Sequence, residues 1–419
     1  MMVLVTLRGW CKVKELKLHK LFEKPISGEW GNEPDQDELG IEVIRTTNFS
    51  NDIRFKNGSE MTYRVIEESK IESKKLNYGD IIIEKSGGSP TQPVGRVLFY
   101  DYTDSISRIC NNFTAILRPT PGNDPKYLAY LLSFLYKRGV VLKHQNKTTG
   151  IINLKLNHYL KDTSVIIPSL ETQKKIVEVL DKAQGLIDAR KEQIRLMDEL
   201  IQSVFYEMFG DPVTNPKGWE VRTVEKVCTN IMGGGTPSKN NLDFYVGDIP
   251  WVTPKDMKID FISDSMDHIN EDAINNSSAK LISENSVLMV IRSGILKRKL
   301  PVAINKRCVA VNQDMKAFII NKNFTNSEFF MYFWKSCENY VLSKVRAVTA
   351  DNIEFKQIKD MQYILPPCEL QNEFSEKVQQ IQTNKTLLEM SLCELENNFS
   401  GLMQSAFAGS LFDDLVVGK

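Results

Sequence analysis

An internal repeat is the feature of this sequence that most constrains its fold. Short motifs of the first half return in the same order in the second half, at an offset of roughly 200 residues. Gly9-Trp10 returns as Gly218-Trp219, and the pattern of residues 40–46 returns at 247–253. The other pairs are 81–87 with 288–294, 149–154 with 349–353, and 166–173 with 364–371. A period this long exceeds that of solenoid repeats, so we predict two copies of one large unit.

Each copy begins with a segment of mainly β character. Short apolar runs such as 79–83 and 96–100 are separated by Gly, Pro, Asn and Asp, which is typical of strands joined by turns. A helix is expected at 127–142 inside the first copy.

Each copy then closes with a long helix. From residue 176, and again from residue 374, apolar residues recur at alternating steps of four and three, which is the heptad pattern of a coiled coil. About 40 residues of helix make a rod of roughly 60 Å. Only Arg190 and Lys385 interrupt the two apolar stripes. We expect both side chains to snorkel to the surface, and the alternative is pairing with acids of a neighbouring chain.

The two helices are natural partners because each has one apolar stripe to bury. We therefore predict that they pair with each other in antiparallel orientation. The residues expected to form this contact are Ile176, Leu180, Ile187, Ile194, Ile201, Val378, Ile381, Leu388, Leu392, Leu395 and Phe399.

The predicted fold class is α+β, with two mainly β domains alternating with two long helices that pair as an antiparallel coiled coil. Prolines mark the boundaries, since Pro168 and Pro366-Pro367 would end a strand and precede a helix. The domains are expected at 1–168 and 211–366, the helices at 169–210 and 367–412, and a short tail at 413–419.

Composition argues against several classes of protein. The 7 cysteines include no Cys-x-x-Cys pair, so neither a disulfide framework nor a zinc site is indicated. No apolar run has the length of a membrane span, and a cytoplasmic protein is expected. The formal net charge is +0, but one segment predicts a local electropositive face. It sets one acid, Glu284, against Lys280, Arg292, Lys297, Arg298, Lys299, Lys306 and Arg307.

The sequence shows no recognisable catalytic or metal site. The glycine-rich run at 233–238 lacks the spacing of a nucleotide-binding loop. Glu72-Ser73-Lys74 after Pro34-Asp35 matches only a permissive nuclease pattern that chance explains, and the 4 histidines stand alone. We therefore predict a chain without catalytic residues, metal or cofactor of its own.

Several of these motifs resemble those of the specificity subunits of type I restriction-modification systems, and the resemblance covers essentially the whole chain. The second copy has Gly218-Trp219, then a run at 231–238 that contains Gly-Gly-Gly-Thr-Pro-Ser, then the segment 247–252. Both copies close with Ile-Pro or Leu-Pro-Pro leading to Gln173 or Gln371 and a long helix. The first copy departs from the pattern at 26–31, so its recognition loops are expected to differ.

The resemblance implies a function and partners. Each β domain would be a target recognition domain that reads one half of a bipartite, asymmetric site in double-stranded DNA. The helices would set the spacing and dock two adenine methyltransferase (M) subunits, and restriction (R) subunits would join in the full complex. S-adenosylmethionine, ATP and Mg would bind those partner subunits. The main alternative is a coiled-coil scaffold or adaptor without sequence-specific DNA binding.

DNA contacts are expected where a strand end delivers a basic or hydroxyl side chain beside a glycine. The alignment of the two copies makes Lys85-Ser86-Gly87 and Arg292-Ser293-Gly294 equivalent segments of this kind. The residues predicted to contact DNA are Lys85, Ser86, Gly87, Gln92, Arg96, Lys147, Thr148, Thr149, Thr236, Ser238, Lys239, Arg292, Ser293, Lys297, Arg298, Lys299 and Arg346. Weaker candidates, placed by the repeat alone, are Thr46, Asn48, Thr253 and Lys255.

Overall fold

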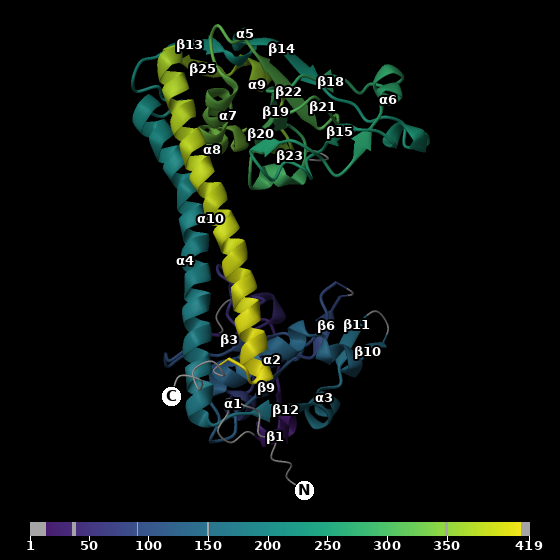
Figure 1. Ribbon diagram of the computed structural model, residues 1–419, viewed down its shortest axis with the longest axis vertical. Helices are drawn as coiled ribbons and strands as arrows, with labels where there is room; N and C mark the ends of the chain where they lie inside the picture. The colour runs from purple at the N-terminus through teal and green to yellow at the C-terminus, as the bar shows by residue number, and fades with distance from the viewer. Residues whose placement is uncertain (1–13, 36–38, 90, 149–150, 348–350, 412–419) are drawn as a thin grey trace. The chain divides into compact units, whose positions relative to one another are not determined.

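The computed structural model describes residues 14–35, 39–89, 91–148, 151–347 and 351–411 (Figure 1). The chain forms two compact units. Unit 1 comprises residues 1–190 and 391–419, and unit 2 comprises residues 191–390. The division between the units therefore falls inside both long helices.

The centre of unit 1 is an antiparallel sheet in the order β2-β9-β5-β7. Smaller sheets have the orders β4-β3-β8, β10-β11-β6 and β1-β12. The strands of unit 1 are β1 (Lys14–Lys17), β2 (Ile26–Ser27), β3 (Ile41–Ile44), β4 (Thr62–Arg64), β5 (Ile81–Glu84), β6 (Ser86–Gly88), β7 (Val97–Phe99), β8 (Arg108–Cys110), β9 (Thr114–Leu117), β10 (Gln145–Thr148), β11 (Ile151–Leu154) and β12 (Ser164–Ile167). Its helices before the first long one are α1 (Glu68–Lys74), α2 (Pro125–Lys137) and α3 (Leu156–Asp162).

Strand β5 shows why a continuous apolar run becomes the middle of this sheet. Side chains alternate between the two faces of a strand, and both faces of β5 are covered. Ile81 and Ile83 belong to the core that includes α2, whereas Ile82 belongs to a second core with Ile44 and Ile116. All of β5 is buried as a result.

Helix α2 is shorter than the predicted 127–142. Asp124 begins it by accepting a hydrogen bond from the backbone N–H of Tyr127 (2.9 Å), and Pro125 occupies the first turn. Gly139 then adopts a left-handed conformation (φ 71°), and the chain continues as a 3-10 helix at Val140–His144.

Unit 2 repeats this topology with additions. Its central sheet has the order β14-β22-β19-β20-β16, and the smaller ones are β17-β15-β21-β18, β23-β24 and β13-β25. The strands are β13 (Glu220–Thr223), β14 (Cys228–Gly233), β15 (Ile249–Val252), β16 (Phe261–Ile262), β17 (His268–Ile269), β18 (Leu281–Ile282), β19 (Val287–Val290), β20 (Val302–Asn305), β21 (Val309–Val311), β22 (Met315–Ile320), β23 (Arg346–Ala347), β24 (Asp351–Asn352) and β25 (Gln362–Leu365). The shorter helices are α5 (Val224–Val227), α6 (Glu271–Asn275), α7 (Ser327–Ser336), α8 (Glu338–Leu342) and α9 (Phe355–Asp360).

Strand pairing confirms the internal duplication. In unit 1, β9 and β7 flank β5, and in unit 2, β22 and β20 flank β19. The closing pair β1-β12 likewise corresponds to β13-β25. The predicted mixture of mainly β domains and long helices is therefore present in both units.

The two long helices are α4 (Leu170–Phe209) and α10 (Cys368–Ala408). They follow the prolines, as predicted, and each ends at a glycine with positive φ, Gly210 (77°) and Gly409 (87°). A left-handed residue directly after the last turn is the usual way to end a helix, because it satisfies the free carbonyl groups, and glycine adopts it without steric cost.

Equivalent buried glutamines attach each long helix to the domain before it. The side-chain amide of Gln173 donates to the carbonyl of Pro168 (3.0 Å) and accepts from the N–H of Asp124 (2.8 Å). The amide of Gln371 donates to the carbonyls of Pro366 (2.9 Å) and Phe324 (3.0 Å). Each glutamine is 1% exposed, so these bonds link the strand-to-helix turn to the start of α2 or the segment before α7 in a dry environment.

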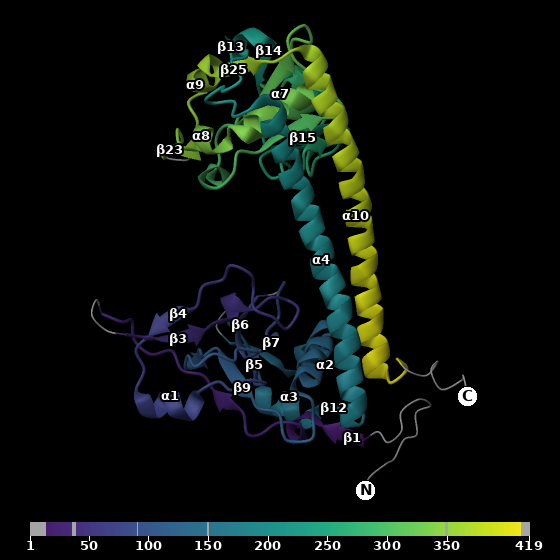
Figure 2. The same ribbon diagram turned by 90° about the vertical axis from the view of Figure 1, so that its left-hand side faces the viewer.

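Within each unit, segments of α4 and α10 pack against each other in antiparallel orientation, as predicted (Figures 1 and 2). In unit 1, Ile176 and Leu180 of α4 share a core with Phe399 of α10. In unit 2, Ile201 of α4 shares a core with Val378 of α10. Of the remaining predicted contact residues, Ile187 is buried in unit 1, whereas Ile194, Ile381, Leu388, Leu392 and Leu395 are partly exposed.

The expectation for Lys385 was wrong in its first choice and in its alternative. Its ammonium group does not snorkel into solvent but pairs with Asp198 of α4 at 2.6 Å, and its side chain is only 19% exposed. The acid thus comes from the other helix of the same chain. A lysine in the heptad stripe is tolerated here because the antiparallel partner supplies the opposite charge.

The helix ends complete the cores of both units. Phe205 and Phe209, near the end of α4, are fully buried in unit 2 against Phe329 of α7 and Phe374 of α10. Ring centroids in this cluster lie between 4.7 Å (Phe209 to Phe329) and 6.4 Å (Phe329 to Phe374) apart. The end of α10 does the same in unit 1, where Phe407 lies 5.4 Å from Tyr127.

Candidate nucleic-acid interface

Each unit presents a four-residue turn at the same point of its framework, with its first and fourth residues buried and its second residue exposed. In unit 1 the turn joins β8 to β9 (residues 111–114), and in unit 2 it joins β21 to β22 (residues 312–315). Both close with a hydrogen bond from the fourth N–H to the first carbonyl, at 3.0 Å from Thr114 to Asn111 and 3.3 Å from Met315 to Asn312. We call these segments tip turn 1 and tip turn 2.

The framework holds both tip turns in the same way. The N–H of Asn111 donates to Ile44 (2.9 Å), and the N–H of Asn312 donates to the equivalent Val252 (3.1 Å). Two successive backbone N–H groups then donate hydrogen bonds to the carbonyl of the third residue of each turn. These groups belong to Lys85 and Ser86 in unit 1 and to Ile291 and Arg292 in unit 2.

A glycine makes the close approach at the base of each tip turn possible. A Cβ on Gly28 would lie 2.1 Å from the carbonyl oxygen of Asn111, and a Cβ on Gly234 would lie 1.8 Å from that of Val311. Any side chain at either position would displace backbone. Gly28 therefore takes the place of Gly234. The first copy keeps this close approach of two backbone segments although it lacks the Gly-Gly-Thr-Pro-Ser run.

The structure corrects the predicted equivalence of Lys85 and Arg292 by one residue. The N–H of Leu154 donates to Lys85 (2.8 Å), and that of the equivalent Ile353 donates to Ile291 (2.9 Å). Lys85 thus corresponds to Ile291, and Arg292 corresponds to Ser86. Aligning the two motifs by residue type matches their basic residues before Ser-Gly and so shifts one copy by one position. The hydrogen bonds of the backbone give the structural correspondence instead.

Tip turn 2 borders a polar cleft of about 1020 Å³ in unit 2. The cleft brings together five of the predicted or weaker candidates, namely Thr236, Lys239, Thr253, Lys255 and Ser293. Its lining also includes Asn312, Gln313 and Asp314, which the sequence reasoning missed. The Thr236 hydroxyl donates to the side chain of Gln313, which ties the glycine-rich run to the tip turn.

Arg292 lies beside tip turn 2 in a fixed orientation. Its guanidinium pairs with the carboxylate of Asp314, with Nη2 at 2.5 Å and Nε at 2.6 Å from Oδ1, and its side chain is 49% exposed. The amide of Asn312 also donates to Asp314 (3.1 Å). The outer edge of the guanidinium therefore faces solvent while its inner edge is held.

The predicted electropositive face of residues 280–307 is partly neutralised. Besides Arg292, Lys297 lies 3.8 Å from Asp351, and Lys306 lies 3.8 Å from Glu328. These acids come from other parts of the sequence. Lys299 lines a different cavity, together with Lys335 and Lys385, and Arg298 is exposed.

The predicted residues of unit 1 have distinct surroundings. The ammonium of Lys85 donates to the hydroxyl of Ser27, and burial lowers the pKa of Lys85. The Ser86 hydroxyl donates to Asn153 (2.6 Å), and Gly87 has a positive φ of 104° beside the ring of Phe113. Gln92 is exposed in a turn with Ser89.

Arg96 is held inside the structure. Its guanidinium bonds both carboxylate oxygens of Glu84 (3.0 and 3.1 Å) and the carbonyl of Thr46 (3.2 Å). Arg96 is 12% exposed and Glu84 is 4% exposed, so in this structure the pair connects β5 to the loop after β3.

Other predicted residues are located less fully. Ser238 and Lys239 are exposed in the loop after β14. Strands β10 and β23 contain Lys147, Thr148 and Arg346, whose side chains lie outside the described part of the chain, as does Thr149.

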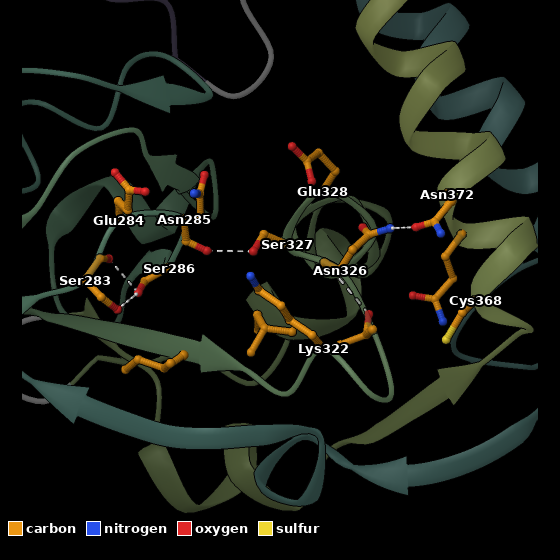
Figure 3. Close-up of a pocket in the computed structure, with 14 residues that line it drawn as sticks. Ser283, Glu284, Asn285, Ser286, Lys322, Asn326, Ser327, Glu328, Cys368 and Asn372 are labelled. Carbon is orange, nitrogen blue, oxygen red and sulfur yellow. Dashed lines mark hydrogen bonds between the residues drawn. The ribbon is translucent and has the colours of Figure 1, made fainter.

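A second polar cavity in unit 2, of about 610 Å³, lies between the loop 283–286 and the starts of α7 and α10 (Figure 3). Ser327 donates to the carbonyl of Asn285 (2.6 Å), and the Asn326 amide donates to Asn372 (3.0 Å). None of the residues predicted to contact DNA lines it. Its hydrogen bonds connect the β domain to the start of α10.

No group of three or more metal-ligating side chains occurs among the described residues. Within the same part of the chain, no helix is long and apolar enough to cross a membrane.

Two units of one topology, each with an exposed turn on a shared framework and each completed by segments of two long helices, define a class of duplicated two-domain proteins. The chain belongs to the type I restriction modification DNA specificity domain family, whose model matches residues 12–196 and 216–397. One match falls on each copy of the repeat, so the suspected resemblance is confirmed.

Two relatives illustrate the membership. The chain is 39% identical over 158 residues to the EcoR124I/EcoR124II specificity subunit of the type I restriction enzyme of Escherichia coli, which is 37% of this chain and 38% of that protein. It is 25% identical over 236 residues to the MjaIX specificity subunit of Methanocaldococcus jannaschii, which is 52% of this chain and 54% of the relative. The chain thus spans about half or less of the length of these relatives.

Solved structures share the fold over almost the whole chain. A chain from a study titled "Structural basis underlying complex assembly and conformational transition of the type I R-M system" has a TM-score of 0.61 at 16% identity, with 95% of this chain and 98% of that chain covered. The type I restriction-modification system S subunit from M. genitalium has a TM-score of 0.50 at 13% identity, with 96% and 98% covered. At such identities the likeness concerns the fold alone.

Proposed function

We propose that this chain is the DNA-reading subunit of a type I restriction-modification complex and that each unit reads one half of a bipartite site in double-stranded DNA. The observation that carries the proposal is the pair of tip turns, held by equivalent hydrogen bonds yet bearing different side chains. A common framework with different exposed residues suits two readers that dock alike and recognise different bases. The recognition domains would correspond to residues 1–168 and 211–366.

The helices are the proposed docking surface for methyltransferase subunits and the element that sets the spacing. In unit 2, four large apolar side chains are exposed on these helices, namely Leu196, Leu200, Leu387 and Met390. Exposed apolar side chains in one region are typical of a partner interface. S-adenosylmethionine, ATP and Mg would bind the partner subunits, which would carry out the methylation and cleavage.

The test is DNA binding by the chain assembled with its methyltransferase subunits. Affinity for duplex DNA should fall steeply with salt, as expected when basic side chains replace counterions, and one bipartite sequence should compete far better than random duplex. Methylated adenines should disappear from that sequence in cells that lack this chain. A purified complex without salt-dependent DNA affinity would instead favour the coiled-coil scaffold.

A further inference from the structure

The tip turns offer different chemistry at equivalent positions. Residues 2 and 3 of the turn are Asn112 and Phe113 in unit 1 and Gln313 and Asp314 in unit 2. Asn112 and Gln313 are exposed, and Phe113 is 42% exposed, which is unusual for a phenyl ring on a rigid turn. Rigid presentation of exposed side chains is what base readout requires, because a mobile side chain loses entropy on contact.

The two units also differ in the residue beside the tip turn. Unit 2 places Arg292 beside its turn, buttressed by Asp314, whereas unit 1 has Ser86 at the equivalent position. A held guanidinium with a free outer edge matches the two acceptors of guanine in the major groove, and a glutamine amide matches adenine. In unit 1, the Phe113 ring beside Gly87 is apolar and exposed, which matches the methyl group of thymine.

We infer that tip turns 1 and 2 are specificity-determining elements, with Arg292 and Gln313 reading a guanine and an adjacent adenine in one half-site and Phe113 reading a thymine in the other. This inference rests on the proposed function. It goes further because it assigns a base class to named residues and predicts that the two half-sites respond to separate substitutions. Lys85, which is directed to Ser27, has no reading role in it.

The experiment maps methylated adenines in cells that express the methyltransferase subunits with the wild-type chain or one variant, and then measures competition by duplexes with single base changes. Arg292→Lys keeps the charge but loses the planar fork. It should lower discrimination at one guanine of one half-site by roughly 5- to 150-fold and leave the other half-site unchanged. Gln313→Ala should relax the neighbouring position, and Phe113→Ala should relax one thymine of the other half-site.

Matched controls separate reading from general effects. Arg222→Lys makes the same change in unit 2 at an arginine of β13 that is likewise paired with a carboxylate, that of Glu220 at 3.0 Å, and that is not among the predicted DNA contacts. Tyr78→Ala removes an aromatic ring that is 65% exposed in unit 1. Both should leave the recognised sequence unchanged.

The outcomes are distinct. Relaxation of one base in one half-site supports the inference. An unchanged recognised sequence for Arg292→Lys, Gln313→Ala and Phe113→Ala, or equal weakening on all sequences, overturns it while the proposed function stands. Absence of sequence-specific methylation with the wild-type chain overturns the proposed function itself.

Discussion

The fully buried Phe205 allows a direct test of how α4 contributes to unit 2. Its ring centroid lies 5.1 Å from that of Phe209, 5.7 Å from that of Phe329 and 5.5 Å from that of Phe374. Phe205→Ala would remove a ring that these neighbours surround and leave a cavity, which typically costs about 3–5 kcal/mol. This is a large share of the roughly 5–15 kcal/mol that stabilises a folded protein, so we expect unit 2 to unfold first.

Urea unfolding followed by tryptophan fluorescence measures this effect. Trp219, Trp251 and Trp334 lie in unit 2, and Trp334 is fully buried beside Phe330 at 6.1 Å. Because two units need not unfold together, the transition midpoint should be compared with one from circular dichroism. Phe205→Leu, which keeps most of the volume, should cost about 1 kcal/mol and serves if the alanine variant does not fold.

Leu200→Ala is the matched control, since Leu200 lies on the same helix but is 42% exposed. A surface change of this kind should alter stability by about 0.5 kcal/mol or less. Equal effects of Phe205→Ala and Leu200→Ala would refute the reasoning that the end of α4 belongs to the core of unit 2.

Three further predictions concern single residues. Gln371→Ala should destabilise unit 2 by about 1–3 kcal/mol in thermal or urea unfolding, because it leaves the buried carbonyls of Pro366 and Phe324 without their shared donor, whereas exposed Gln357→Ala should have little effect. The side-chain hydrogen bond from Arg54 lowers the pKa of Asp188 below its usual 3.8, so the stability that Asp188 adds is present above pH 3.8 and lost as the pH falls through the lowered folded value. Wild type should therefore exceed Asp188→Asn in unfolding free energy at neutral pH, and a gap that persists under strong acid would contradict this origin. Gly185→Ala should stabilise α4 by about 0.8–1.0 kcal/mol, since a Cβ there meets open space, and an unchanged melting temperature would show that helix propensity does not limit α4.

The duplication, the two long helices and their antiparallel contact were all predictable, because each depends on a pattern that the sequence carries directly. The heptad stripe shows which residues need burial, as Ile176 and Val378 illustrate. It could not show what buries them: Ile176 packs into the β domain as well as toward α10. The partner of Lys385 was missed for the same reason, since the spacing of one helix contains no information about the facing residue.

The candidate site was predictable only in part. Similar motifs located the strand end near Arg292 but gave the wrong register, because hydrogen bonds to the tip turn, rather than residue type, decide which positions correspond. Gln313 and Phe113 were not predicted, because neither is basic and neither is adjacent in the sequence to a glycine at a strand end. The Asn-x-x pattern shared by 111–113 and 312–314, directly after the matched strands, was the signal available.

The way the helix ends are used gives the duplication a physical reason to persist. Ile201 and Phe205 of α4 fill the core of unit 2, and Phe399 and Met403, at the equivalent positions of α10, fill the core of unit 1. One repeat by itself would therefore lack the helix end that completes its core. The end of its own helix would have no core to pack into. Exposing such buried side chains costs about 1.5–3 kcal/mol each, which is large against the stability of a domain. Each repeat is thus stabilised by the other, so substitutions near the end of α4 should destabilise unit 2, and substitutions near the end of α10 should destabilise unit 1.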